Sequence, residues 1–198
     1  MDESKQDGAT DWRHFSPPEG YTERDIALLT EQLQAICGQP LTRIRQLYGD
    51  VFEFGVQRPQ KNRKGDDVNW ADFRLSIICA DWRVVQRGRI ILASREYRDE
   101  THLVSDFDES PETPQIAESR RIAREFFDAV TEGKFIVQSV VVRDHADMVI
   151  RLSEDLVIES FSSSCQNEDS WHFCNDNAKV SGLISAAACY IGTFNERD

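Results

Sequence analysis

The stretch of sequence that decides the fold is residues 71–94, ADFRLSIICADWRVVQRGRIILAS. It is rich in the β-branched, aliphatic and aromatic side chains that favour strands. In an extended conformation Leu75 and Ile77 would lie on one face, and Ile78 and Ala80 on the other. A strand that is apolar on both faces is usually central in its sheet, so this stretch predicts a central strand.

A turn signal at Arg87-Gly88 divides the second half of this stretch. Glycine adopts the positive φ that a tight reversal requires. Residues 82–86 and 89–93 are therefore predicted to form a β-hairpin.

Length and charge limit the classes of function. The chain has 198 residues, which is enough for one sizeable domain, and its 35 acidic and 23 basic residues give a net charge of −12. Such a surface repels the phosphates of nucleic acids and the headgroups of anionic lipids, so we expect neither nucleic-acid nor membrane binding. The charge suits a basic protein partner, although simple solubility is the more common reason for an acidic surface.

The five cysteines include no C-x-x-C pair, and residues 1–12 are polar where a signal peptide would be apolar. No apolar run approaches the roughly 20 residues of a membrane span. These features predict a cytoplasmic protein without disulfides. They leave the oligomeric state open.

The beginning of the chain divides into an arm and a helix. Residues 1–20 contain many charges and a Pro-Pro pair, which predicts a flexible N-terminal arm, followed by a single domain over 21–198. Thr22 and Asp25 form a capping-box pattern, and apolar residues then recur at helical spacing until Gly38. A second helix is predicted from Pro114, preceded by Thr113 as its N-cap, to Gly133.

The remaining segments alternate between strands and turns. Residues 41–48 and 51–56 predict a hairpin, whereas 57–69 are polar, with Pro and Gly, and predict a long exposed loop. Later strands are predicted at residues 135–142, 148–152, 156–161 and 171–174; for 180–191 the periodicity fits both helix and strand. The resulting fold class is α+β, with an antiparallel, meander-like sheet and two capped helices packed on it.

An acidic segment separates the hairpin from the second helix. Residues 95–113 carry seven carboxylates around a few apolar side chains. Such a pattern can bind a protein partner, with the aromatic residue as anchor and the carboxylates steering the approach. The predicted partner-binding residues are Asp106, Phe107, Asp108, Glu109 and Glu112. The alternative is an ordinary flexible connection.

Three other groups of residues are candidate sites of chemistry. Cys165, His172 and Cys174 offer soft metal ligands but lack the paired spacing and the fourth ligand of a zinc site. The set Asp128, Glu132 and Lys134 is similar to the carboxylates and lysine of metal-dependent nucleases, but it falls at the end of a helix instead of in a strand.

The third group is Asp144-His145 with Asp147, which has no nucleophile beside it. We therefore predict no catalytic residue, no metal site and no cofactor.

Several short motifs resemble a loosely defined family of small bacterial α+β proteins. They are Gly38-x-Pro40-Leu41, Phe52-x-Phe54-Gly55, Asp81-Trp82-Arg83 followed by Gly88, Asp155-Leu156-x-Ile158 and Trp171-x-Phe173. The likeness covers about residues 36–175, and the N-terminal arm, the first helix and the acidic segment depart from it. Members resemble cytoplasmic immunity-type proteins that accompany bacterial toxins or defence loci, which implies inhibition by binding.

Within this resemblance, Arg83 is a candidate partner contact supported from below by Trp82. The alternative places Trp82 in the core and makes Arg83 an ordinary surface charge. Together these features predict a non-enzymatic cytoplasmic binding protein of the immunity or inhibitor type that acts on a basic protein partner. The alternatives are a metal-assisted hydrolase or nuclease, and a structural subunit of a bacterial defence or secretion assembly.

Overall fold

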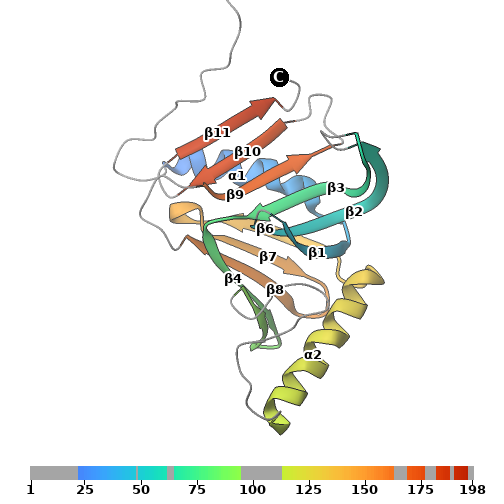
Figure 1. Ribbon diagram of the computed structural model, residues 1–198. Helices are drawn as coiled ribbons and strands as arrows, with labels where there is room; N and C mark the ends of the chain where they lie inside the picture. Colours follow the sequence, from blue (N-terminus) through green and yellow to red (C-terminus); the bar gives the residue numbers. More distant parts are fainter. Residues whose placement is uncertain are drawn as a thin grey trace, which may run out of the picture.

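The computed structural model describes residues 22–47, 49–61, 65–94, 113–162, 169–176, 182–187 and 190–195. These residues form two α-helices, α1 (Glu23–Leu33) and α2 (Pro114–Thr131), two short 3-10 helices, η1 (Gln34–Ile36) and η2 (Asp144–Ala146), and two antiparallel sheets (Figure 1). The predicted α+β class is thus confirmed. The predicted arm at residues 1–20 lies outside the described residues.

The first sheet has six strands and the second has five. In spatial order, the first consists of β1 (Leu41–Leu47), β2 (Gly49–Lys61), β3 (Asp67–Ile77), β9 (Asp169–Asn175), β10 (Gly182–Ala187) and β11 (Tyr190–Asn195). The second consists of β5 (Arg89–Ala93), β4 (Ala80–Gln86), β8 (Leu156–Ser162), β7 (Met148–Leu152) and β6 (Val137–Val142).

Residues 71–94 connect the two sheets. β3 is central in the six-stranded sheet, as predicted, and ends at Ile77, whereas β4 begins at Ala80 in the five-stranded sheet. The chain crosses again between β8 and β9. The expected single meander is therefore divided between two sheets, because an alternating apolar pattern specifies a buried face but not the strand that pairs beside it.

The core lies where the two sheets and the two helices meet. The rings of Phe52 on β2 and Trp82 on β4 pack edge to face, with centroids 5.0 Å apart. α1 contributes Leu29 and Leu33 to the same buried cluster, and α2 contributes Phe126. Burial of these apolar side chains from both sheets provides the main stabilisation of the fold.

α1 begins and ends as its sequence predicts. The Thr22 side chain accepts a hydrogen bond from the Asp25 backbone N–H, and the Asp25 carboxylate accepts one from the Thr22 N–H. The helix tightens into η1 before Gly38, which has a φ of 81°. The capping box satisfies backbone donors that the first turn would otherwise leave unpaired.

Both predicted hairpins are confirmed. Arg87 and Gly88, with φ of 50° and 76°, form the two-residue turn between β4 and β5. Gly49, with φ of 93°, begins β2, where a Cβ would lie 2.4 Å from the carbonyl oxygen of Ile77. Any side chain at position 49 would therefore collide with β3.

The prediction of a loop over residues 57–69 is wrong. β2 continues to Lys61 and β3 starts at Asp67, and the two strands pair along this extension after a register shift between Phe54 and Gln57. The sequence gives no alternation here because the extended hairpin is mostly exposed, so its residues carry no apolar face. Within residues 180–191, for which the periodicity fits both helix and strand, residues 182–187 form a strand and a further strand begins at Tyr190.

The later strands agree with prediction at β6, β7, β8 and β9. The side chain of Trp171 on β9 is fully buried and its Nε1 donates to the carbonyl of Ala146. Neither described helix is long and apolar enough to span a bilayer.

Candidate functional site

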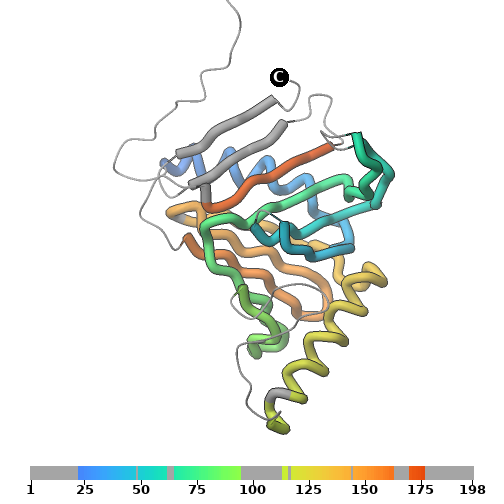
Figure 2. Tube along the Cα trace, in the orientation of Figure 1, coloured from blue at the N-terminus to red at the C-terminus, as the bar shows by residue number. Residues whose placement is uncertain are grey.

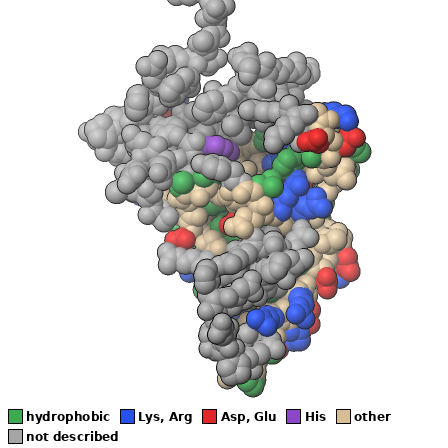
Figure 3. Space-filling view, in the orientation of Figure 1, with side chains coloured by type: hydrophobic (Ala, Val, Ile, Leu, Met, Phe, Trp, Pro, Cys, Tyr) green, Lys and Arg blue, Asp and Glu red, His purple; other side chains and the backbone are tan. Residues whose placement is uncertain are grey.

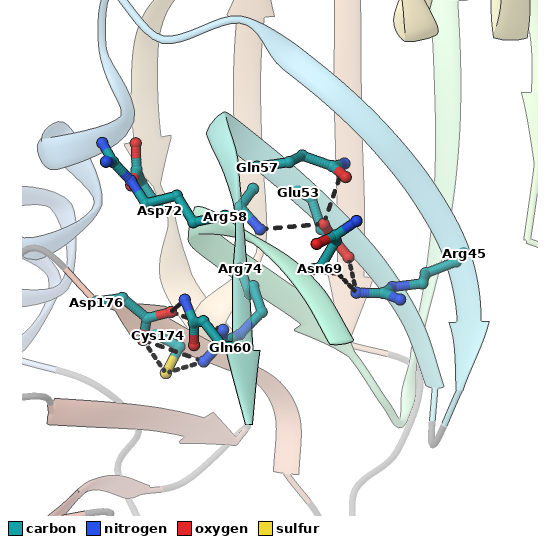
Figure 4. Close-up of polar contacts among 11 residues, drawn as sticks. Arg45, Glu53, Gln57, Arg58, Gln60, Asn69, Asp72, Arg74, Cys174 and Asp176 are labelled. Atoms are coloured by element: carbon teal, nitrogen blue, oxygen red, sulfur yellow. Dashed lines mark hydrogen bonds and ion pairs between the residues drawn. The ribbon is translucent and has the colours of Figure 1, made fainter. Parts of the chain in front are cut away.

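One face of the six-stranded sheet carries an unusual concentration of charged side chains. Phe52, Leu75 and Phe173 point into the core, so their neighbours along the strands point to the opposite face. We call this opposite face of β1, β2, β3 and β9 the charged face. Its interacting side chains, shown in Figure 4, are Arg45, Glu53, Gln57, Arg58, Gln60, Asp72, Arg74, Cys174 and Asp176.

Glu53 is the most buried member of the charged face, with no exposed surface. Its carboxylate forms an ion pair with Arg45 and accepts hydrogen bonds from the backbone N–H of Ala71 (3.2 Å) and from Nε2 of Gln57 (3.4 Å). Burial lowers the pKa of the Arg45 guanidinium, and Glu53 opposes that shift. A buried carboxylate of this kind depends on its partners to offset the cost of desolvation.

A second ion pair joins β3 to the end of β9. Nη1 of Arg74 lies 2.7 Å from Oδ2 of Asp176, and Nη2 lies 3.2 Å from Oδ1. The same Nη2 lies 3.1 Å from the Sγ atom of Cys174. This bidentate geometry fixes the guanidinium more firmly than a single hydrogen bond would.

Trp70 contacts both of these arginines. The guanidinium carbon of Arg45 lies 3.9 Å from the centre of the indole ring, and that of Arg74 lies 4.8 Å away. Both distances are within the range of cation–π attraction. Trp70 therefore links the two ion pairs across β1, β2 and β3.

Asp72 has a local structural role beside the β2 irregularity. Its Oδ2 accepts from the backbone N–H of Val56 (3.1 Å), and its Oδ1 accepts from Nε of Arg58 (2.8 Å). Val56 lies within the register shift, where regular ladder pairing is interrupted. The carboxylate thus satisfies a backbone donor that the irregularity would otherwise leave unpaired.

A shallow pocket of about 230 Å³ lies on the charged face. It is lined by Leu47, Val51, Trp70, Arg74, Ser76, Ile78 and His172. Blue and green side chains adjoin over the β1–β2–β3 region in Figure 3, which reflects this mixture of basic and apolar groups. The volume is below the range usual for pockets that enclose a drug-sized ligand.

A larger groove lies between the β4–β5 hairpin and α2. Its volume is about 480 Å³. Apolar side chains from both sides line it, namely Ile91, Ile122, Phe126, Ala129 and Phe135, together with Gln86, Arg87, Arg89 and Glu125. Figure 2 shows the hairpin and α2 beside each other, and α2 contacts β5. We call this depression the hairpin–helix groove.

The structure places two of the predicted partner-binding residues. Trp82 is 2% exposed, and its Nε1 donates to Oδ2 of Asp50 (2.7 Å), so its side chain belongs to the core. Arg83 is at the surface, where its Nε bonds to Glu159 (2.6 Å) and its guanidinium lies 5.0 Å from the ring centre of Phe161. Trp82 can support Arg83 from below, but it cannot contact a partner directly.

The other predicted partner-binding residues, Asp106, Phe107, Asp108, Glu109 and Glu112, lie outside the described residues. Their role stays a prediction. The two ends of this acidic segment are attached at Ser94, directly after β5, and at Thr113, directly before α2.

Two of the three candidate sites of chemistry involve metal binding. His172 and Cys174 lie on β9, and Cys165 is outside the described residues. Within the described part of the chain, no group of three or more His, Cys, Asp or Glu side chains could hold a metal ion. Glu132 forms an ion pair with Lys134 just beyond the end of α2. The set therefore lies at the end of a helix and not in a strand, as the sequence predicts.

The third group, Asp144, His145 and Asp147, lies in the turn between β6 and β7. Oδ1 of Asp147 accepts from the backbone N–H of Ser162 (2.8 Å), and His145, with φ of 60°, is exposed in η2. Sequence reasoning missed the charged face altogether. The only available signal was a glutamate, Glu53, between two phenylalanines of a predicted strand.

The Asp50–Trp82 bond, which joins the two sheets, gives a pH-dependent prediction. Burial raises the pKa of the Asp50 carboxyl, and the hydrogen bond from Trp82 lowers it in part. A carboxyl whose pKa is raised by folding contributes stability below its unfolded pKa and loses that contribution as the pH rises through its folded pKa. Asp50→Asn keeps an oxygen for the indole N–H and removes this titration.

We therefore expect Asp50→Asn to be more stable than the wild type at about pH 7 and to lose that advantage at about pH 4. Urea unfolding of both proteins at the two pH values measures the difference. An equal difference in unfolding free energy at both pH values would contradict the prediction.

Comparisons of the chain with protein-family models, with curated proteins and with solved structures gave no match. The resemblance to immunity-type proteins therefore stays a prediction.

Proposed function

We propose that this chain is a non-enzymatic cytoplasmic binding protein of the immunity or inhibitor type, which neutralises or regulates a basic protein partner. The observation that carries the proposal is where the acidic segment is attached to the described structure. Its two attachment points, Ser94 and Thr113, directly adjoin β5 and α2, the two elements that form the hairpin–helix groove.

The groove has the composition of a protein-binding surface. Its apolar lining residues Ile91, Ile122 and Phe126 are half-buried or buried, whereas the charged residues Arg89 and Glu125 are exposed. Apolar surface at the centre and charged groups around it are typical of protein interfaces. The carboxylates of the adjoining segment would steer a basic partner toward this surface.

The charged face also supports a binding role in preference to catalysis. Glu53, Asp72 and Asp176 are each engaged by an arginine and by further hydrogen bonds. These contacts hold the strands of the sheet together. These carboxylates are thereby used in building the scaffold that carries the proposed partner-binding surface.

The test is reversal of the segment's charge. The variant carries Asp106→Lys, Asp108→Lys, Glu109→Lys and Glu112→Lys, and its control carries Glu31→Lys, Asp67→Lys, Asp128→Lys and Glu154→Lys, four exposed carboxylates elsewhere. A partner captured by the wild type is identified, purified and titrated against each protein at several salt concentrations.

We expect the segment variant to bind at least about tenfold more weakly and to lose most of the salt dependence, while the control keeps both. Equal affinity and equal salt dependence in the segment variant would refute the acidic surface. A captured complex in which the chain is only one of many fixed subunits would favour a structural role instead.

A further inference from the structure

The two edges of the five-stranded sheet differ in how their backbone groups are satisfied. At the β6 edge, Oγ1 of Thr30 accepts from the N–H of Val142 (3.3 Å), and Nε2 of Gln34 donates to the carbonyl of Val140 (3.0 Å). The backbone of Val137 exchanges hydrogen bonds of 2.8 and 2.9 Å with Gly38 and Gln39. α1 and the residues after it thus close this edge.

At the opposite edge, β5, the described residues leave the outer side of the strand unpaired. β5 pairs with β4 on one side, and no described residue forms a hydrogen bond to its backbone from the other side. Ile90 on this strand is 52% exposed. Unpaired strand edges are usually blocked, so an open edge with an exposed apolar side chain is a site at which another strand can pair.

The hairpin–helix groove adjoins this edge. Arg89 and Ile91 of β5 line one side, and Ile122 and Phe126 of α2 line the other. An added strand places alternate side chains on one face, where a groove of this kind can receive them. Arg87 and Arg89 lie at the hairpin end of the edge, so carboxylates in the added strand would meet cations there.

We propose that β5 receives an extended segment of a partner protein by antiparallel strand addition, with apolar side chains in the hairpin–helix groove and carboxylates opposite Arg87 and Arg89. The antiparallel direction is chosen because all neighbouring strands of this sheet pair antiparallel. It places the carboxylates at the C-terminal end of the segment. The inference rests on the proposed function, because it requires a protein partner; that partner is basic overall and carries these carboxylates only in the added segment.

The test uses a fluorescent peptide, Thr-Val-Thr-Val-Thr-Glu-Glu, capped at both ends, and fluorescence anisotropy with the full chain. A second peptide has its glutamates at the N-terminus, and a third has N-methyl groups on alternate residues, which remove backbone donors. We expect the first peptide to bind and the other two to bind at least about tenfold more weakly. Equal binding of the N-methylated peptide, equal binding of the reversed one, or no binding of the first would overturn the inference.

Two protein variants locate the site. Arg89→Glu reverses a cation at the edge and Ala129→Leu fills part of the groove, and both should weaken the first peptide by about tenfold. The control, Arg143→Glu, makes the same charge change at an exposed turn after β6 and should leave binding unchanged. Circular dichroism and urea unfolding verify that each variant is folded. Loss of binding in the control, or its retention in both site variants, would refute this location.

Failure of the strand-addition proposal can be distinguished from failure of the proposed function. One outcome is that the protein fails to bind the peptide but still binds its partner, and that this binding depends on Asp106, Asp108, Glu109 and Glu112. This outcome would support the proposed function and refute strand addition at β5. A chain that binds the peptide at β5 but shows no dependence on those carboxylates supports strand addition and refutes the acidic surface.

Discussion

Replacing Arg45 by methionine is expected to destabilise the protein by about 3 kcal/mol, near the lower end of the range for breaking a buried ion pair. The partner that remains, Glu53, has no exposed surface. The hydrogen bonds that Glu53 accepts from Ala71 and Gln57 offset part of the lost stability but supply no positive charge. The substitution also removes the guanidinium that lies on the ring of Trp70.

The control for this prediction removes both charges. Arg45→Met combined with Glu53→Gln leaves no buried charge without a partner. The amide oxygen of the glutamine introduced at position 53 can still accept a hydrogen bond from the N–H of Ala71. We expect the double variant to recover most of the stability lost in the single one. Urea unfolding measures both, and a double variant that is less stable than Arg45→Met would contradict this account of the charged face.

Replacing Trp82 by alanine is expected to cost about 3–5 kcal/mol, the range for deleting a large buried aromatic side chain. Trp82 is 2% exposed and packs edge to face on Phe52 across the interface of the two sheets. Its loss would leave a cavity there and would also remove the indole N–H from the half-buried carboxylate of Asp50.

Two further variants separate the contributions to this loss. Trp82→Phe keeps an aromatic ring against Phe52 but removes the N–H, so we expect an intermediate loss of stability. Trp70→Ala deletes the same side chain from the half-buried charged face and should cost less than Trp82→Ala, because less surface returns to water. A loss below about 1 kcal/mol for Trp82→Ala would show that this residue is not part of the core.

The Trp82 result also bears on the predicted partner contact. If Trp82 acts in the core, Trp82→Phe should lower stability without changing affinity for the partner once the protein is folded. Arg83→Ala, by contrast, removes a surface group held by Glu159 and is the variant that tests direct contact.

Local sequence patterns predicted the elements whose signals lie within a few residues. The capping box at Thr22, the turn at Arg87-Gly88 and the apolar stripe of α1 depend only on neighbouring residues, and all three are present. The same local reasoning failed at residues 57–69, where an exposed hairpin extension carries no apolar alternation. Periodicity reports a buried face, so it has no signal where both faces meet water.

The pairing of distant segments had no such local signal. Arg45 meets Glu53, and Arg74 meets Asp176, because β1, β2, β3 and β9 are neighbours in one sheet. Strand order depends on which apolar faces fit together across the whole core, and sequence spacing does not encode it. The charged face was therefore not predictable from the residues that form it.

By itself the sequence determined the α+β class, the helix ends, the hairpin turns and a strongly negative net charge, because each follows from local backbone preferences or from composition. Only the tertiary structure decided that the strands form two sheets, that α1 closes the β6 edge, and that no described residue pairs with the outer side of β5 beside the groove. Those features arise from contacts between residues far apart in the chain, whose energies are settled only when the sheets and helices pack together.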